Sequence, residues 1–409
     1  AGMIEELSES DERVTEEYLE EIIDFFRRAL EYPLNINQAE IKDLDKFFFL
    51  SDFQKGAIIG YRQEYGEFVS LNELFNIPGI TKREAELLTP FICVSGGSRA
   101  YRLRLSSILK EARLQVLSRV KYIPERQFGF TPVSRDDYRK NPDCRYAGPP
   151  GYLYGQLKYE LGDILKISIT SEKDPGEKGP DYLSASISLH TAGIVEKLVA
   201  GSYSARFGQG LVLWNSFPGA FDTNPSSLCK KESALVPYNS TGENDSFSGA
   251  AVNLRFKRTD LSLMVSHRGY DARITGEGFT SLLTTGLHNT STAISRRKNL
   301  FATVAGYNVS FKGSGFTVSQ TSVIYSYDRP YAGRDSLKIA RLGKPGAWGG
   351  NAGLSWYKVF PKNRVFGEIA IDNGASAAFI AGVVSSHGSA TESCILLSRI
   401  SSGYLAPYS

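Results

Sequence analysis

The feature that most constrains the fold of this chain is a change of hydrophobic period near Arg113. Residues 113–123, 152–161 and 164–173 alternate apolar and polar side chains, whereas earlier segments repeat at helical spacing. Successive side chains of a strand point to opposite faces, so alternation predicts strands with one apolar and one polar face. Most of the chain beyond Arg113 is therefore expected to be β-sheet.

The hairpin at 251–269 shows this alternation most clearly. One face of its first strand carries Val252, Leu254 and Phe256, and a turn at 258–260 reverses the chain. Further segments bring the number of candidate strands to about thirteen, many of them near the length of membrane-spanning strands. These further segments are residues 182–190, 197–207, 300–312, 316–327, 349–360, 364–372, 375–386 and 392–400.

Two architectures fit these strands. A soluble β-sandwich or propeller also alternates, whereas a transmembrane barrel needs strands of about nine to eleven residues with a lipid-facing and a lumen-facing side. We expect an antiparallel transmembrane β-barrel over 113–409. If its strand lines the lumen, Arg206 would set an electrostatic constriction, but a rim or lumen position with no selective role is favoured. The expected lumen-facing residues are Arg206, Gln209, Asn253, Arg255 and Lys257.

Aromatic residues near strand ends also favour the barrel, because such barrels carry aromatic girdles at both membrane interfaces. Tyrosines at the sheet edges of a soluble protein would give a similar pattern. The residues concerned are Tyr122, Tyr152, Tyr154, Tyr182, Trp214, Tyr325, Tyr327, Trp356 and Tyr357.

The first hundred residues follow a helical pattern instead. Segment 16–30 places its apolar residues on one face, which predicts an acidic amphipathic helix within residues 1–33. Residues 1–98 carry nine Lys or Arg against twenty Asp or Glu, a net charge of −11, whereas the rest of the chain carries +14. This contrast predicts two domains with different surroundings, and hence an α+β multidomain fold.

Residues 34–96 are expected to form a tandem of helical hairpins, followed by a linker at 97–112. A capping side chain followed three residues later by Glu or Gln marks a helix start. The pattern occurs four times: Asn37 with Glu40, Ser51 with Gln54, Ser70 with Glu73, and Thr81 with Glu84.

Segments 34–44, 57–80 and 87–94 resemble the helix-hairpin-helix module of ComEA-type competence DNA receptors. In that family a Gly-hydrophobic-Gly turn lets the backbone approach a phosphate, which is held at the start of the next helix. The resemblance implies nucleic-acid binding through the second hairpin of this chain. The residues at the matching positions are Gly79, Ile80, Thr81, Lys82 and Arg83.

The first hairpin departs from that pattern, since Phe49, Leu50 and Ser51 replace Gly-hydrophobic-Gly. A phenylalanine side chain blocks close approach to the backbone. Affinity for nucleic acid comes largely from cations, yet residues 34–94 hold six Lys or Arg against nine Asp or Glu. Nucleic acid is therefore a disfavoured partner, and a scaffold reused for contact with protein is favoured.

A second resemblance covers most of the chain. Segments 169–179, 200–217, 284–299 and 365–382 are similar to a family of Bacteroidota outer-membrane proteins with a helix-hairpin-helix segment before a barrel. The resemblance implies a barrel in the outer membrane, in contact with its lipid, and a helical domain in the periplasm. Members of that family continue past the region matching 396–409, which implies a barrel that is incomplete at the C-terminus.

The sequence carries no constellation typical of catalysis. None of the four histidines, His190, His267, His288 and His387, has a partner at metal-ligand spacing, and no Gly-x-Ser-x-Gly elbow occurs. The Gly-rich segment 206–214 does not join a strand to a helix. We expect no enzyme activity, no cofactor and no metal site. Cys144 and Cys229 lie in loop-like stretches, which leaves open whether they pair or remain thiols.

The sequence favours a non-enzymatic outer-membrane protein whose periplasmic helical domain docks an envelope protein, in assembly or gated transport. One alternative is a DNA-uptake component that binds DNA through the second hairpin. Another is a diffusion channel that uses the helical domain as a plug.

Overall fold

The computed structural model describes most of the chain from residue 25 onward. The described residues are 25–27, 29–30, 33–37, 39, 41–44, 47–94, 112–162, 164–191, 193–215, 225–230, 232, 234–239, 241–242, 245–313, 315–360, 362–387 and 391–409. Most of the helix expected over 1–33 and nearly all of the linker expected at 97–112 lie outside them, although 25–27 and 29–30 are helical.

The N-terminal region is a small helical unit. Two short strands pair in parallel at its two ends, through Leu34 with Ile92 and Asn35 with Cys93, and so close it into one body. Its elements are β1 (Leu34–Asn35), α3 (Ile41–Leu44), α4 (Asp52–Tyr65), η1 (Leu71–Asn76), α5 (Lys82–Leu88), η2 (Thr89–Phe91) and β2 (Ile92–Cys93).

Three of the four expected capping boxes are present. Ser51, Ser70 and Thr81 each accept a backbone N–H from the first turn that follows, while Gln54, Glu73 and Glu84 accept the N–H of these three cap residues in return. Asn37 has a different role. Its side-chain amide donates hydrogen bonds to the carbonyls of Phe68 and Val94 and accepts one from the backbone N–H of Phe68. These bonds tie the two hairpins together.

The rest of the described chain is dominated by one antiparallel sheet of fourteen strands. Its order is β18-β17-β16-β15-β14-β13-β10-β9-β7-β6-β5-β4-β3, with β8 paired to β7. The bounds are β3 (Ala112–Tyr122), β4 (Gly151–Leu161), β5 (Leu165–Lys173), β6 (Tyr182–His190), β7 (Val195–Arg206), β8 (Ala234–Pro237), β9 (Phe247–Phe256), β10 (Thr259–Tyr270), β13 (Leu300–Gly313), β14 (Phe316–Tyr327), β15 (Trp348–Val359), β16 (Asn363–Asp372), β17 (Ala377–Ser386) and β18 (Glu392–Ile400).

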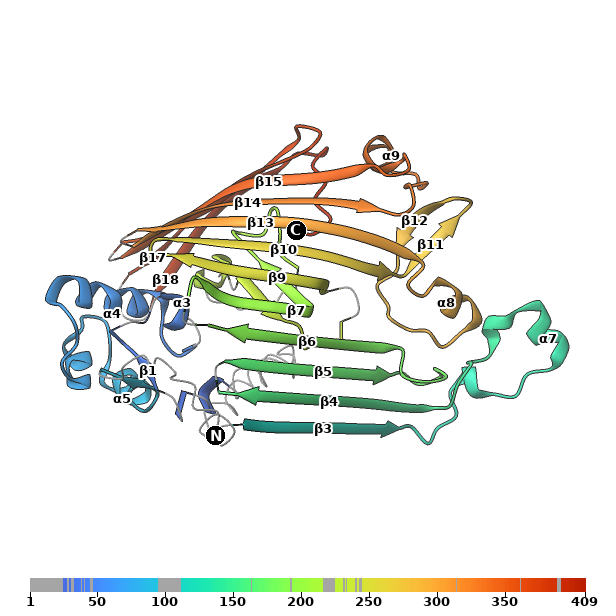
Figure 1. The fold of residues 1–409 in the computed structure, drawn as a ribbon, viewed down its shortest axis with the longest axis horizontal. Coiled ribbons are helices and arrows are strands. Elements are labelled where there is room, and N and C mark those ends of the chain that lie inside the picture. Colours follow the sequence, from blue (N-terminus) through green and yellow to red (C-terminus); the bar gives the residue numbers. More distant parts are fainter. Residues whose placement is uncertain are drawn as a thin grey trace.

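The antiparallel sheet is as the sequence predicts, but a closed barrel is not formed by the described strands. Closure requires the first and last strands to pair. Among the described residues, β3 and β18 are the two edges of the sheet and no ladder joins them. The sheet is therefore an open, curled wall, as Figure 1 shows.

The two ends of the wall differ. One end carries the short connections 162–164, 191–194, 257–258, 314–315, 360–362 and 387–391. The other carries the connections 123–150, 174–181, 207–246, 271–299, 328–347 and 373–376, most of which are long. The helical unit lies at the short-turn end, whereas α7 (Arg135–Lys140), α8 (Ser291–Arg296) and α9 (Ser336–Leu342) lie at the opposite end (Figure 1).

A small hairpin of β11 (Ala272–Thr275) and β12 (Gly278–Leu282) also lies at the long-loop end. The remaining elements are single turns within the connections: η4 (Phe128–Phe130), η5 (Pro142–Cys144) and η6 (Pro225–Leu228).

The outer face of the wall is apolar and exposed from one edge of the sheet to the other. In β10, for example, Leu263 and Val265 are exposed while Ser262, Met264 and Ser266 are buried. Exposed apolar residues of the strands include Leu114, Val116, Val120, Leu153, Ile169, Leu183, Ile187, Leu198, Phe256, Phe301, Tyr307, Val309, Phe311, Val318, Ile324, Leu354, Ile369, Ile371, Val383, Ile395 and Leu397.

The inner face encloses a packed core. Tyr203, Phe247 and Tyr325 are almost fully buried there, together with apolar residues of the connections. Some expected girdle aromatics belong to this core. Tyr325 and Tyr327 point inward because they share the face of Val323 and not that of exposed Ile324. Within the described part of the chain, no helix is long and apolar enough to cross a membrane.

Candidate functional site

The second hairpin brings its five predicted residues together at one turn. Gly79 has a φ of 90°, and space is open around the position that a Cβ would occupy. Ile80 is buried in the helical unit and Thr81 is the N-cap of α5. Lys82 and Arg83 are exposed, with the Lys82 ammonium 3.7 Å from the carboxylate of Glu86. The turn therefore has the backbone shape expected of a phosphate-binding hairpin.

The electrostatics of this turn oppose an anion. A carboxylate oxygen of Glu84 accepts the backbone N–H of Thr81 at 2.8 Å, and the N–H of Ile80 donates to the carbonyl of Ile77 at 3.2 Å. Burial alone would raise the pKa of Glu84. Hydrogen bonds from Thr81 and Gln54 outweigh burial and hold that pKa below its ordinary value. A negative charge thus lies at the N-terminus of α5 and uses the backbone N–H of Thr81.

The first hairpin is closed by its own packing. Leu50 is buried, and the Phe49 ring lies 5.9 Å from that of Phe47 and stacks on Phe26 at 6.1 Å. Ser51 is used as the N-cap of α4. The aromatic ring that replaces glycine is thus part of the core of the helical unit.

Asn253 and Arg255, predicted to face the lumen, lie in a neutralised network near the short-turn end. Arg255 lies 2.5 Å from a carboxylate oxygen of Glu196 and 3.4 Å from one of Asp260, which also pairs with Lys312 at 2.6 Å. Asn253 accepts a hydrogen bond from Ser262 and donates to Glu196. Two cations and two carboxylates balance, so this part of the wall does not form a basic ring.

Two other residues predicted to face the lumen, Lys257 and Arg206, lie elsewhere. Lys257 is exposed in the two-residue turn between β9 and β10, with a φ of 34°, because the strand ends at Phe256. Arg206 ends β7 and forms a bridge to Trp214, and its Nε is buried without a hydrogen-bond partner in the structure. Neither residue therefore joins Asn253 and Arg255 in a common ring of polar side chains.

Gln209 belongs to a segment that folds into the interior, residues 207–215, which we call the inner segment. Gly208 and Gly210 have φ values of 62° and 82° and turn the chain tightly around Gln209. A carboxylate oxygen of Glu368 in β16 accepts the backbone N–H groups of Gln209 at 2.7 Å and Leu211 at 3.1 Å. The inner segment is therefore fastened to the opposite wall by one carboxylate.

The chain beyond β18, residues 401–409, packs against the inner segment. The Tyr404 hydroxyl donates to the carbonyl of Leu211 at 2.6 Å, and the N–H of Trp214 donates to the carbonyl of Tyr408 at 2.7 Å. The Tyr408 ring lies 5.5 Å from that of Phe247 and 5.6 Å from that of Tyr325. These two pieces of chain fill the space between facing parts of the wall.

The helical unit contacts the wall through α4. The Phe53 ring packs against buried Phe366 and Val384. The guanidinium of Arg364, a residue that is only 1% exposed, lies 5.8 Å from the centre of the Phe53 ring. A Cβ at Gly56 would lie 3.1 Å from a methyl group of Val359. The helical unit is thus seated on the short-turn end of β15, β16 and β17.

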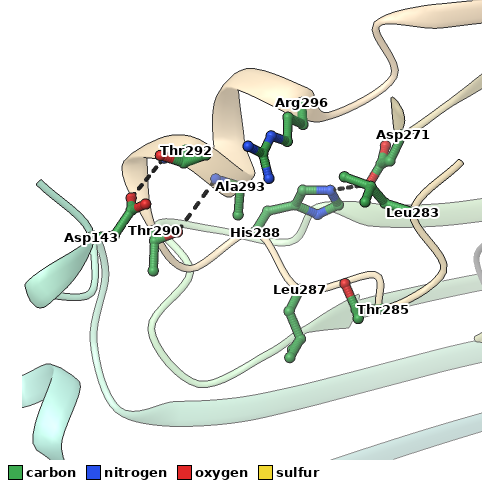
Figure 2. Close-up of a pocket in the computed structure, with 10 residues that line it drawn as sticks. All are labelled: Asp143, Asp271, Leu283, Thr285, Leu287, His288, Thr290, Thr292, Ala293 and Arg296. Atoms are coloured by element: carbon green, nitrogen blue, oxygen red, sulfur yellow. Dashed lines mark hydrogen bonds and ion pairs between the residues drawn. The ribbon is translucent and has the colours of Figure 1, made fainter. Parts of the chain in front are cut away.

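A second polar cluster lies at the long-loop end. The ring nitrogens of His288 face Asp181 through Nδ1 and Asp271 through Nε2, and its backbone N–H donates to Glu177 at 2.9 Å. Figure 2 shows His288 and Asp271 at a cavity of about 200 Å³ that Arg296 also lines. Residue spacing in the sequence does not predict this cluster, because its members come from two different connections.

Burial governs the electrostatics of this cluster. Burial and a hydrogen bond shared with Asp181 raise the pKa of Glu177 to about 7. Burial also opposes the charge of Asp181, but hydrogen bonds with His288 and Glu177 prevail and lower its pKa. Both ring nitrogens of His288 are engaged by carboxylates, so the ring is not placed to act as a general base.

The cysteines do not form the pair considered from the sequence. In the described residues Cys144 and Cys229 are not joined by a disulfide. Cys229 instead packs in the cluster of Phe366 and Val384, with Cys394 beside it.

Comparisons with known proteins identify one part of the chain. Residues 32–93 match the family model described as helix-hairpin-helix motif, so the N-terminal unit contains a helix-hairpin-helix domain. A search of the curated proteins finds no match.

Several solved porins show a slight likeness in structure. The anion-selective porin from Comamonas acidovorans has 11% identity and a TM-score of 0.29, over 70% of this chain and 88% of that one. OmpF from Salmonella typhi, in complex with daunomycin, has 9% identity and a TM-score of 0.29, over 72% and 94%. A loop-deletion mutant of OmpT from Vibrio cholerae has 8% identity and a TM-score of 0.27, over 70% and 93%.

Proposed function

We propose that the chain is a non-enzymatic outer-membrane β-barrel protein whose helix-hairpin-helix domain lies in the periplasm. There the domain docks a protein partner of the bacterial envelope, in assembly or in gated transport. The observation that carries this proposal is the exposed apolar outer face, which runs from β3 to β18. Soluble monomers rarely expose a continuous apolar surface of that extent, whereas the lipid-facing side of a barrel requires one.

The lengths of the connections support this direction of insertion. Outer-membrane barrels have short periplasmic turns and longer extracellular loops. The helix-hairpin-helix domain lies at the short-turn end, and α7, α8 and α9 lie at the long-loop end (Figure 1). This arrangement favours a periplasmic domain that reaches partners beneath the membrane.

The surface of the domain supports a protein partner. Tyr65, Val69 and Phe75 are 68%, 86% and 44% exposed and offer apolar surface for a contact. Exposed Glu64 and Glu67 lie beside them in the sequence. Such a set suits a partner with an apolar anchor and a basic rim.

Affinity capture of the full-length protein in mild detergent tests the docking role. We expect an envelope protein to be recovered by the wild type and lost by Val69→Ala/Phe75→Ala. Lys82→Ala/Arg83→Ala is the matched control and should recover it as the wild type does. Recovery of no envelope protein, or equal recovery by the apolar double variant, would contradict docking through this surface.

A gated passage is a second candidate, favoured by the way the inner segment is held. Glu368 fastens it across the interior, and residues 401–409 pack over it. Planar-bilayer recordings would compare the wild type with a variant in which Gly-Ser residues replace 209–213. We expect low conductance from the wild type and a marked increase from the variant. Equal conductance would count against a gate formed by this segment.

DNA uptake remains the alternative with a direct test. We expect full-length protein in detergent to bind duplex DNA weakly or not at all at low salt, because the Glu84 carboxylate lies at the second hairpin and accepts the backbone N–H of Thr81. Salt-sensitive binding that Lys82→Ala/Arg83→Ala abolishes would favour DNA uptake over protein docking.

A further inference from the structure

We propose that Glu177, Asp181 and His288 form a binding site for a divalent transition-metal ion, Zn²⁺ or Mn²⁺, at the long-loop end. Their candidate ligand atoms lie within 4.8 Å of one another, and all three residues are buried. Bonds of about 2.1 Å to a common ion require only small side-chain movements from this arrangement. The site goes beyond the proposed membrane function and does not depend on it.

The histidine is held as a metal ligand usually is. Ligating histidines generally donate the other ring N–H to a carboxylate, which fixes the tautomer and orients the ring. Asp271 faces Nε2 of His288 and leaves Nδ1 directed toward Asp181 (Figure 2 shows the Asp271 contact). Asp271 is itself positioned by the backbone N–H of Lys298, at 2.7 Å. A metal ion would replace the proton between Nδ1 and Asp181.

The loop that supplies the carboxylates is held rigidly. Gly148 donates its N–H to the carbonyl of Gly176 at 2.7 Å, and Gly176 donates to that of Pro149 at 3.0 Å. A Cβ at Gly148 would lie 1.9 Å from the carbonyl oxygen of Glu177, so the 123–150 and 174–181 connections are in direct contact. A carboxylate oxygen of Glu177 also accepts the N–H of Asp174 at 2.7 Å. The ligands are therefore largely in place before an ion binds.

The donor set selects the class of ion. An imidazole nitrogen with two carboxylates suits Zn²⁺ or Mn²⁺, whereas Ca²⁺ and Mg²⁺ prefer oxygen ligands alone. His288 also lines the neighbouring cavity of about 200 Å³, which has room for water near the site. A bound ion would join the 174–181 connection to the 271–299 connection and so stiffen the long-loop end.

The test measures metal on the full-length protein in detergent. After treatment with EDTA, the protein is dialysed separately against Zn²⁺, Mn²⁺ and Ca²⁺, and bound metal is measured by mass spectrometry. We expect about one equivalent of Zn²⁺ or Mn²⁺ per chain. His288→Gln and Asp181→Asn should each lower the affinity at least tenfold, and Asp271→Asn about tenfold to a hundredfold. His387→Gln is the control, since His387 lies at the short-turn end, and should bind as the wild type does.

A second measurement uses the wild type alone and so does not depend on whether any variant folds. Tryptic cleavage within 271–299 of the wild type should slow when Zn²⁺ or Mn²⁺ is restored after EDTA, and Ca²⁺ should have no such effect. The proposal is overturned if the wild type binds no more Zn²⁺ or Mn²⁺ than His288→Gln does. It is equally overturned if only Ca²⁺ binds, or if restored metal leaves the cleavage rate unchanged.

Discussion

At the scale of single residues, Glu368 holds the inner segment against β16. Its carboxylate joins β16 to two backbone N–H groups of the inner segment. A buried backbone donor left without a partner costs about 1–3 kcal/mol. Because two such donors meet at one carboxylate, removal of that carboxylate should release the inner segment rather than the strands.

We therefore expect Glu368→Ala to raise the rate of tryptic cleavage at Arg206 and Lys230 and to lower the stability of the protein in detergent by about 3 kcal/mol. Glu125→Ala is the matched control, since Glu125 is exposed in the 123–150 connection. Equal cleavage of both variants would show that Glu368 does not hold the inner segment.

Glu84 gives a prediction about pH. Its pKa is lower in the folded domain than in the unfolded chain, so its charge stabilises the fold above the unfolded pKa. That contribution is lost as pH falls through the folded pKa. Glu84→Gln should cost about 0.5 kcal/mol at pH 7 and progressively less as pH falls through the folded pKa, measured by unfolding of the helical domain. A cost that does not depend on pH would mean that the charge of Glu84 is not the stabilising feature.

Residue-scale features were predictable where their causes are local. The capping boxes at Ser51, Ser70 and Thr81 need only a cap and a partner three residues on. Alternation extended to Lys257 predicts a lumen-facing side chain, but the strand ends at Phe256 and Lys257 lies in the turn. The approach of His288 to Asp181 could not be predicted, because it depends on how two long connections pack.

At the scale of elements, α4 links the two domains. It is the helix whose side chain Phe53 enters the apolar cluster at the short-turn end, while the exposed Val69 and Phe75 follow it in the chain. The sequence predicts this helix from its capping box. It does not predict the contact with the wall, since an apolar residue on a helix can pack in its own domain equally well.

Phe53→Ala should weaken the seating of the helical domain on the wall by about 2–3 kcal/mol, because the aromatic packing is lost. Limited proteolysis should then release the domain faster than from the wild type. Phe75→Ala is the control and should leave release unchanged while it weakens capture of the partner. The same rate of release from both variants would contradict a contact made through Phe53.

The inner segment is the element that sequence patterns describe least well. Its motif, 206–214, is Gly-rich and apolar, which fits a turn, a loop or the end of a strand. Only the fold shows that Gly208 and Gly210 adopt positive φ values and bring two backbone N–H groups to Glu368. That carboxylate is distant in sequence, so no local pattern identifies it.

At the scale of the whole molecule, period-2 alternation predicts the antiparallel sheet and its two faces. It does not predict whether the interior is wet or packed, because polar and apolar residues share the inward face. Ser262 and Met264, for example, are both buried on that face of β10. The side-chain period is fixed by strand geometry, whereas the filling of the interior depends on connections that have no period.

The outer face gives a prediction for the whole molecule. Val265→Arg places a charge on the apolar exterior of β10, and an arginine near the bilayer midplane costs about 2–4 kcal/mol. Folding into lipid vesicles should be impaired by this amount. Val69→Arg, on the helical domain, is the control and should insert as the wild type does. Equal insertion of both variants would argue against lipid contact at Val265.

Epitope labelling in intact Gram-negative cells tests the proposed membrane topology most directly. An epitope tag would be placed within 123–150, at the long-loop end, and another directly before Leu34. We expect the first tag to be labelled from outside intact cells, and the second only after the outer membrane is permeabilised. Recovery of the protein in the soluble fraction, or labelling of the second tag alone on intact cells, would contradict an outer-membrane barrel with a periplasmic helix-hairpin-helix domain.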